Sequence, residues 1–197
     1  MGNEKPLKRL LVAGNDKLSG KLIAQLVENQ QLRIILDKST NAKRTWQLYR
    51  NGRLKLIWLL KMTIAELARE KSHVSIFSNI KNNDELFHFI HQYRIEQVYL
   101  FRVGLIINKE ILGLGVDILN THCARIPDYA GLGAIAKALK EGAFDQVATL
   151  HRVTERIDEG EIIKIEPYKL NPKLSYRRNE DIAYQAGIRL LQKTITE

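Results

Sequence analysis

An amide, an imidazole and a carboxylate stand in the second half of the sequence at a spacing that could support acyl transfer. Asn120 and His122 are two residues apart at the end of an apolar run, and Asp158 follows 36 residues after His122 in a polar stretch. An amide N–H can stabilise a developing oxyanion, an imidazole can exchange a proton, and a carboxylate can orient the imidazole. These three residue types therefore predict an acyl-transfer site.

The pair formed by Asn120 and His122 also has a plainer interpretation. Asn-x-His pairs arise by chance, and a histidine at a strand end is often satisfied by a backbone carbonyl. If the strand persists through His122, both side chains point to the same face. The other histidines and the single cysteine form no credible metal-ligand set, so we expect no metal and interpret these histidines as structural or exposed: His73, His88, His91 and His151.

The elements that must position the three residues alternate along the chain. Short apolar runs with β-type patterning are separated by segments with apolar residues at helical spacing. We expect strands at 8–14, 32–36, 74–77, 97–101, 116–121, 147–153 and 161–170. We expect helices at 18–26, 84–93, 108–112, 131–142 and 179–194, and two more within 45–69 with a break at Asn51-Gly52.

Strands joined by helical crossovers predict an α/β fold, a doubly wound and mostly parallel sheet of about seven strands. At 197 residues the chain is expected to form a single domain, 1–197, with a basic helical insert at about 41–71. Ligands of such sheets bind beyond the carboxyl ends of the strands. The turns after Ala13, Phe101, Thr121 and Val153 are therefore the places to look for a site.

Charge is distributed unevenly along a sequence of ordinary globular composition. Hydrophobic residues make up 45% and charged residues 27% of the chain, so we expect a folded, globular protein. The net charge of +9 lies in residues 1–71, with 15 Lys and Arg against 6 Asp and Glu, whereas 72–197 carry 16 of each. A basic region attracts nucleic acid, anionic membranes or phosphorylated small molecules, and it is equally the solvated face of a helix.

Cysteine content and apolar run lengths indicate a cytoplasmic protein. Cys123 is the only cysteine and cannot form an internal disulfide, and no secretory signal is recognisable. The most apolar stretch, 54–62, contains two lysines and is far shorter than the roughly 20 residues that a membrane span needs. We therefore expect no membrane span.

Two longer motifs surround the three candidate residues. ILNTHCARIPDYAG at 118–131 and VATLHRVTERIDEGEII at 147–163 together resemble the core signature of the folate-dependent formyltransferases. This family includes glycinamide ribonucleotide transformylase, methionyl-tRNA formyltransferase and the sugar N-formyltransferases. The resemblance places Asn120, His122 and Asp158 on the catalytic positions, with Pro127 and Gly131 in the intervening loop.

The resemblance implies that the formyl donor is 10-formyltetrahydrofolate, that the acceptor is a primary amine, and that no metal is required. The oxyanion would meet Asn120 and protonated His122, and Asp158 would hold the imidazole and help to move protons. Family members hold the pteridine ring between two segments, which correspond here to Arg102, Val103, Gly104, Leu105 and Ile106 and to Val153, Thr154 and Glu155. Simple core packing is the alternative for the apolar members of this set.

The sequence departs from the family pattern directly after His122. Cys123 stands where the family often has proline, and Ala124-Arg125 follow where small polar residues are common. The shape of this loop and its acceptor contacts are therefore open. Because Cys123 neighbours His122 on a strand, its side chain is expected to point the opposite way, as a buried and unreactive thiol.

The first turn after the first expected strand offers a second candidate site. Gly14, Asn15, Lys17 and Ser19 could bind an anion at the start of a helix, where the ribonucleotide transformylases hold a substrate phosphate, although Asp16 opposes this. The turn matches no phosphate-binding P-loop, and the Gly-x-Gly-x-x-Gly fingerprint of dinucleotide-binding folds is absent.

The expected function is N-formylation of a small amine, with a nucleotide-linked amino sugar as one example. Methionyl-tRNA and glycinamide ribonucleotide are alternative acceptors. Nucleic acid is disfavoured as a partner, because the family members that act on tRNA normally carry a further C-terminal domain, whereas this sequence ends just after the core. A formyltetrahydrofolate hydrolase and a non-catalytic binding module are rival readings of the same fold. The insert at 41–71 could cover the acceptor site, form a homodimer contact, touch a membrane surface or be a plain exposed face.

Overall fold

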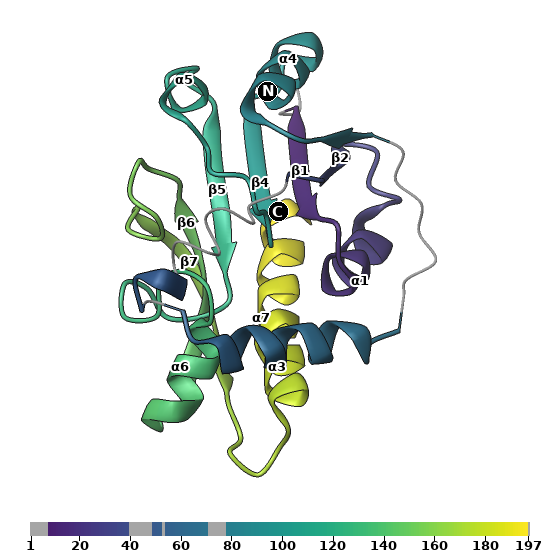
Figure 1. Ribbon diagram of the computed structural model, residues 1–197. Coiled ribbons are helices and arrows are strands. Elements are labelled where there is room, and N and C mark those ends of the chain that lie inside the picture. The colour runs from purple at the N-terminus through teal and green to yellow at the C-terminus, as the bar shows by residue number, and fades with distance from the viewer. Residues whose placement is uncertain (1–7, 40–48, 53, 71–77, 197) are drawn as a thin grey trace.

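One seven-stranded sheet organises the computed structural model, which describes residues 8–39, 49–52, 54–70 and 78–196. The strand order is β3-β2-β1-β4-β5-β6-β7; the pairs from β3 to β5 are parallel, and β6 and β7 are antiparallel to their neighbours (Figure 1). The prediction of a mostly parallel α/β sheet is confirmed. The strands are β1 (Arg9–Gly14), β2 (Leu32–Asp37), β3 (Asn79–Ile80), β4 (Gln97–Phe101), β5 (Asp117–His122), β6 (Asp145–Arg152) and β7 (Ile162–Lys169).

Helices cover both faces of the sheet, as the nearly continuous apolar strands require. On one face, Leu11 and Phe101 belong to a core shared with α1, α6 and α7, and on the other, Leu10 and Leu100 pack with α4 and α5. The alternation of Leu10 and Leu11 between the two cores follows from the two-residue period of a strand. The helices are α1 (Lys17–Leu26), α3 (Leu56–Leu67), α4 (Asn83–Tyr93), α5 (Lys109–Leu112), α6 (Ala134–Glu141) and α7 (Tyr176–Thr196).

Most expected elements are present with small shifts at their ends. The strand at 97–101 matches β4 residue for residue, while the strand expected at 74–77 lies outside the described residues. The helix expected from 131 begins only at Ala134, because Gly131 and Gly133 adopt left-handed φ angles of 78° and 80° that a right-handed helix does not contain. Helix α7 begins at Tyr176 rather than at 179.

Helix α3 belongs to the segment predicted as a basic insert, and it lies across α7 (Figure 1). Its inner side packs on the body of the protein through Ala65, which is buried, and through Trp58, whose ring is 3.0 Å from the point where a side chain on Gly133 would begin. Its outer side leaves Leu56, Ile64 and other aliphatic side chains more than half exposed. Among the described residues, no helix is both long and apolar enough to cross a membrane.

Candidate active site

The pairing of β5 with β6 builds the first part of the site. In the antiparallel register, Asn120 lies directly opposite His151, near the carboxyl end of β5. His122 is two residues further on and lines the same cavity as Asn120. The amide and the imidazole predicted from the sequence therefore lie together. Strand β6 adds a second imidazole, that of His151, in contact with Asn120.

Asp158 reaches the site because of the unusual backbone of the loop between β6 and β7. Its φ is 54°, a left-handed conformation that Asp tolerates better than most residues because its short side chain can form local hydrogen bonds. Two residues later, a side chain on Gly160 would overlap the carbonyl oxygen of Arg152, so only glycine fits. The Asp-x-Gly motif is thus a structural requirement for returning the chain close to β6.

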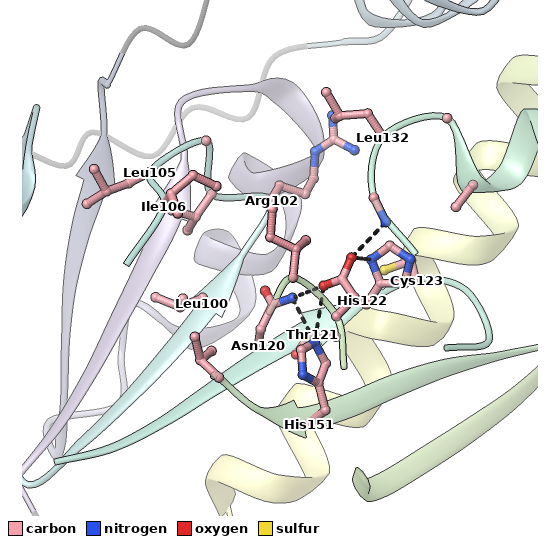
Figure 2. Close-up of a pocket in the computed structure, with 18 of the residues that line it drawn as sticks. Leu100, Arg102, Leu105, Ile106, Asn120, Thr121, His122, Cys123, Leu132 and His151 are labelled. Carbon is pink, nitrogen blue, oxygen red and sulfur yellow. Dashed lines mark hydrogen bonds and ion pairs between the residues drawn. The ribbon is translucent and has the colours of Figure 1, made fainter. Parts of the chain in front are cut away.

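The carboxylate of Asp158 is the centre of the cluster, because it contacts Asn120, His122 and His151. Figure 2 shows the side chains of these three residues close together. Its Oδ2 accepts a hydrogen bond from the backbone N–H of Gly131 at 2.8 Å and lies 3.4 Å from His122 Nδ1. Its Oδ1 lies 3.3 Å from both Asn120 Nδ2 and His151 Nε2. Burial alone would raise the pKa of Asp158, but the hydrogen bond with His151, the charge of His122 and the Gly131 N–H lower this pKa to about 2. The carboxylate is therefore ionised at neutral pH.

The contacts of Asn120 and His151 depend on where the imidazole carries its protons. His151 Nδ1 lies 3.1 Å from the carbonyl oxygen of Arg152, to which only a protonated nitrogen can donate. His151 Nε2 faces both Asn120 Nδ2, at 3.1 Å, and Asp158 Oδ1, at 3.3 Å; without a proton it accepts from the amide, and with a proton it donates to the carboxylate. When Asn120 donates to both Nε2 and Asp158, both of its amide hydrogens are in use, and one must leave its partner before it can stabilise an oxyanion.

His122 also has protein partners at both ring nitrogens. Nε2 lies 2.7 Å from the carbonyl oxygen of Tyr129, while Nδ1 faces Asp158. The plainer interpretation, a strand-end histidine satisfied by a backbone carbonyl, therefore describes one contact of His122. It does not account for the contact between His122 and Asp158. Both neighbours are acceptors, so a His122 ring with a proton on each nitrogen can donate a hydrogen bond to both of them.

A cavity of about 280 Å³ opens beside the cluster and contains both segments expected to hold the donor. Its wall is largely apolar, and Ile106 stands at its edge with 42% of its surface exposed (Figure 2). Met62 of α3 also lines the cavity, so part of the predicted insert covers it. The sequence-predicted residues that line it are Arg102, Val103, Gly104, Leu105, Ile106, Asn120, His122, Val153, Thr154, Glu155 and Asp158.

One buried carboxylate, that of Asp37, and one partly exposed carboxylate, that of Asp16, hold the segment after β4 in place. Asp37, at the end of β2, accepts hydrogen bonds from the backbone N–H groups of Gly104 at 2.6 Å and Leu105 at 3.0 Å. Arg102 donates to Asp16 at 2.7 Å and lies over the ring of Tyr184. The N–H groups of Gly104 and Leu105 are therefore already hydrogen-bonded within the protein. The polar edge of a bound ring would have to form hydrogen bonds with other backbone groups.

The residues of the first turn do not all lie together. Gly14 and Asn15 line a second, open hollow with Asp16 and Asp37, whereas the side chain of Lys17 is bound to the carbonyl oxygens of Leu67 and Arg69 near the end of α3. A side chain on Gly14 would overlap the carbonyl oxygen of Arg102, so this glycine is required for the approach of β4.

Cys123 packs away from solvent against α7. Burial is the main reason why the pKa of its thiol rises to about 12, which leaves almost no thiolate at neutral pH. The position of a Cβ on Gly187 would lie 2.5 Å from the sulfur, so the thiol occupies the space that glycine leaves open. The residue that replaces the family proline therefore anchors the loop after β5 to α7.

His151 and Asp37 are the residues that the sequence interpretation did not single out. His151 is only 2% exposed and contacts two of the three predicted catalytic residues. Its place in the motif VATLHRVTERIDEG was visible, but only the register of β6 against β5 shows which side chains it meets. Asp37 ends a strand, which is a general signal for functional residues in such sheets.

Comparisons with known proteins show which sequences and folds this chain resembles. Methionyl-tRNA formyltransferases of Carboxydothermus hydrogenoformans and Clostridium acetobutylicum are 22% and 23% identical, over 93% and 96% of this chain and 56% and 58% of their own length. The chain thus spans little more than half the length of these curated relatives. The structure is similar to a phosphoribosylglycinamide formyltransferase from Anaplasma phagocytophilum, with a TM-score of 0.68, 15% identity and coverage of 97% of this chain and 86% of that one.

A sugar N-formyltransferase from Shewanella sp. has a similar fold, with a TM-score of 0.64 and 16% identity over 95% of this chain and 68% of that one. At 15% and 16% identity, the similarity to these two structures shows a shared fold and no more. A family model described as formyl transferase matches residues 8–181, which is most of the sequence. With its sheet, its motifs and this match, the chain belongs to the formyl transferase family.

Proposed function

We propose that this chain is an N-formyltransferase that moves a formyl group from 10-formyltetrahydrofolate to a primary amine of a small molecule, such as a nucleotide-linked amino sugar. The observation that carries the proposal is the meeting of Asn120, His122 and Asp158 at one end of a cavity whose walls contain both predicted donor segments. Polar groups at one end of an apolar cavity suit a ligand with a flat ring and a reactive group.

The residues present fit a pteridine-containing donor. Val103, Leu105, Ile106 and Val153 give the cavity an apolar wall, and the anchoring of Gly104 and Leu105 to Asp37 holds this wall in a fixed shape. A preformed site loses less conformational entropy when the ligand binds. When bound, 10-formyltetrahydrofolate supplies the formyl carbon that an amine attacks, forming a new C–N bond as the bond to the folate nitrogen breaks.

The protein's own groups stabilise charge and move protons in this reaction. His122, held by Asp158, is suited to donate a hydrogen bond to the developing oxyanion once Nε2 leaves the carbonyl of Tyr129. Asn120 contributes a second donor when it releases Asp158 or His151. The attacking nitrogen loses one proton and the leaving nitrogen gains one, so Asp158 and His122 need only relay a proton between them.

Methionyl-tRNA is the second candidate acceptor, because the curated relatives with coverage above 90% of this chain are named methionyl-tRNA formyltransferases. Its reacting group is also a primary amine, so the same three residues would perform the chemistry. The difference lies in the surface that receives the rest of the acceptor. Both acceptor classes are therefore tested in parallel with the same donor.

The test combines donor binding with turnover. Binding of 5-formyltetrahydrofolate is measured by calorimetry, with substitutions of Val103 and Ile106 by Asp as variants that should weaken it. The formation of tetrahydrofolate and of formate is then followed with amino sugar nucleotides, glycinamide ribonucleotide and methionyl-tRNA in separate reactions. His122→Gln and Asp158→Asn should bind the folate but lose turnover.

Amine-dependent formation of tetrahydrofolate without formate is the expected result. Formate release that does not depend on an amine would instead identify a hydrolase, and folate binding without turnover would identify a binding module. Wild-type turnover in His122→Gln or Asp158→Asn would show that the proposed mechanism is wrong. No folate binding at millimolar concentration would exclude the proposed donor.

A further inference from the structure

The start of α1 is placed where an α/β protein commonly binds an anion. The helix begins at Lys17, directly after β1 ends at Gly14, and β1 lies in the centre of the sheet between β2 and β4. Unpaired backbone N–H groups and the helix dipole make such a position attractive for phosphate. Whether a phosphate can bind there depends on what already occupies these donors.

Carboxylates of the chain itself occupy the first turn. The backbone N–H of Lys17 donates to Glu66 Oε1 at 2.8 Å, and that of Ser19 donates to Asp16 Oδ1 at 2.9 Å. Asp16 is the ordinary N-cap of the helix. Glu66 is different, because it arrives from α3, 49 residues away in the sequence. It places a second negative charge at the point where a phosphate oxygen would bind.

The cation of the first turn is also engaged. Lys17 Nζ donates to the carbonyl oxygens of Leu67 and Arg69, at 2.9 and 2.7 Å, just where α3 ends. The beginning of α1 thus receives a carboxylate from α3, and the end of α3 receives an ammonium group from α1. Both contacts complement the helix dipoles, and together they leave neither the N–H of Lys17 nor its ammonium group for a ligand.

A buried arginine keeps α3 in this position. The side chain of Arg69 is 2% exposed and pairs with Glu180 at 2.5 Å and Asp181 at 2.8 Å, both on α7. Arg69 also lies 3.5 Å from Glu66. Breaking such a pair on one side leaves a buried charge without a partner, which is strongly destabilising. Glu66 is therefore presented to α1 by a well-anchored helix end.

We propose that Glu66 is a specificity-determining residue that closes the start of α1 to phosphate groups. The acceptor is then an amine that carries no phosphate at this position; an anionic group elsewhere in the acceptor would have to be recognised by other residues. The identity of the ligand as an acceptor rests on the proposed function. The closure itself is a property of α1 and α3 and is measurable without any turnover.

Calorimetric titration with ribose 5-phosphate and with inorganic phosphate tests the closure at constant ionic strength. Glu66→Ala removes the carboxylate and frees the N–H of Lys17, and Glu66→Gln removes the charge but keeps a neutral oxygen for that N–H. Glu70→Gln is the matched control, because Glu70 is exposed at the same end of α3 and its change alters the net charge equally. Thermal unfolding establishes that each variant is folded.

The expected result is no saturable binding to the wild type or to Glu70→Gln. Glu66→Ala should bind both probes saturably, at least about tenfold more tightly than the weakest binding that the titration can detect, with Glu66→Gln between it and the wild type. Equal binding by the wild type and Glu66→Ala, or no gain in either Glu66 variant, overturns the proposal. Because the titration contains neither folate nor amine, these outcomes are independent of whether the chain transfers a formyl group.

Discussion

His151 Nε2 and Asp158 Oδ1 lie 3.3 Å apart, and this contact joins the central part of the β5–β6 pairing to the loop that carries the proposed catalytic carboxylate. His151 is buried and is itself oriented by the carbonyl of Arg152. We therefore expect the imidazole to act on the proposed reaction through Asp158 and Asn120 rather than on the substrate, as a positioning residue.

We expect His151→Leu to lower kcat by roughly 10- to 100-fold, as the loss of a supporting partner does in other polar sites, with little change in the affinity for a folate analogue. His151→Gln should recover part of kcat, because its amide nitrogen can donate to Asp158. Steady-state kinetics and calorimetry on both variants check this. Equal losses in the two variants at equal thermal stability would contradict a positioning role.

Asp37 should influence donor binding more than catalysis. Its carboxylate holds the N–H groups of Gly104 and Leu105, which lie in the cavity wall and not among the reacting groups. We expect Asp37→Ala to weaken the binding of 5-formyltetrahydrofolate about tenfold or more while kcat at saturation changes little.

Asp145→Ala is the matched control for this change, because Asp145 is exposed at the start of β6 and pairs with Lys169 outside the cavity. It should leave folate binding unchanged. A loss of kcat in Asp37→Ala without any loss of affinity would show that the loop acts on the chemistry instead.

The low pKa of Asp158 predicts how stability depends on pH. Its pKa falls from 3.8 to about 2 on folding, so the folded state favours the ionised form. This contribution, about 2 kcal/mol, is fully present above the unfolded pKa near 4 and is lost as the pH falls through 2. The unfolding free energy of the wild type minus that of Asp158→Asn should therefore shrink between pH 4 and pH 2.

Urea titrations of both proteins at several acidic pH values measure this difference. A difference that stays constant over that interval would show that the surroundings of Asp158 do not favour its ionised form. Glu155→Gln is a suitable control, because Glu155 is exposed in the same loop and its ion pair with Lys109 is solvated.

The contact between Cys123 and Gly187 predicts a pair of compensating substitutions. A Cβ at position 187 would lie 2.5 Å from the sulfur and 3.4 Å from atoms of Phe101 and Thr121. Gly187→Ala should lower the unfolding free energy by about 1–3 kcal/mol, the usual range for overpacking, even though alanine favours helix more than glycine. Cys123→Ala in the same chain should recover most of the loss.

Thermal and urea unfolding of the two single variants and the double variant give the coupling energy directly. Additive effects would mean that the sulfur is not the obstacle. A strong coupling would identify Cys123 and Gly187 as one packing unit that sets the distance between the end of β5 and α7.

The sequence by itself determined the class of fold and predicted a candidate site. The period of two in the strands and the period near 3.6 in the helices are local properties, so the alternation of elements, including β4 at Gln97–Phe101, could be predicted from it. Asn120 and His122 were found because they stand at a strand end, where such sheets collect functional residues. Their catalytic roles, and that of Asp158, stay predictions.

Only the tertiary structure decided which groups hold these residues. The contacts of Asn120 with His151, of Asp37 with Gly104 and of Lys17 with Glu66 join residues 31, 67 and 49 positions apart. Each depends on strand register, on the order of strands in the sheet or on where one helix end meets another. Local periodicity carries no information about these, because they are selected by the packing of the whole core.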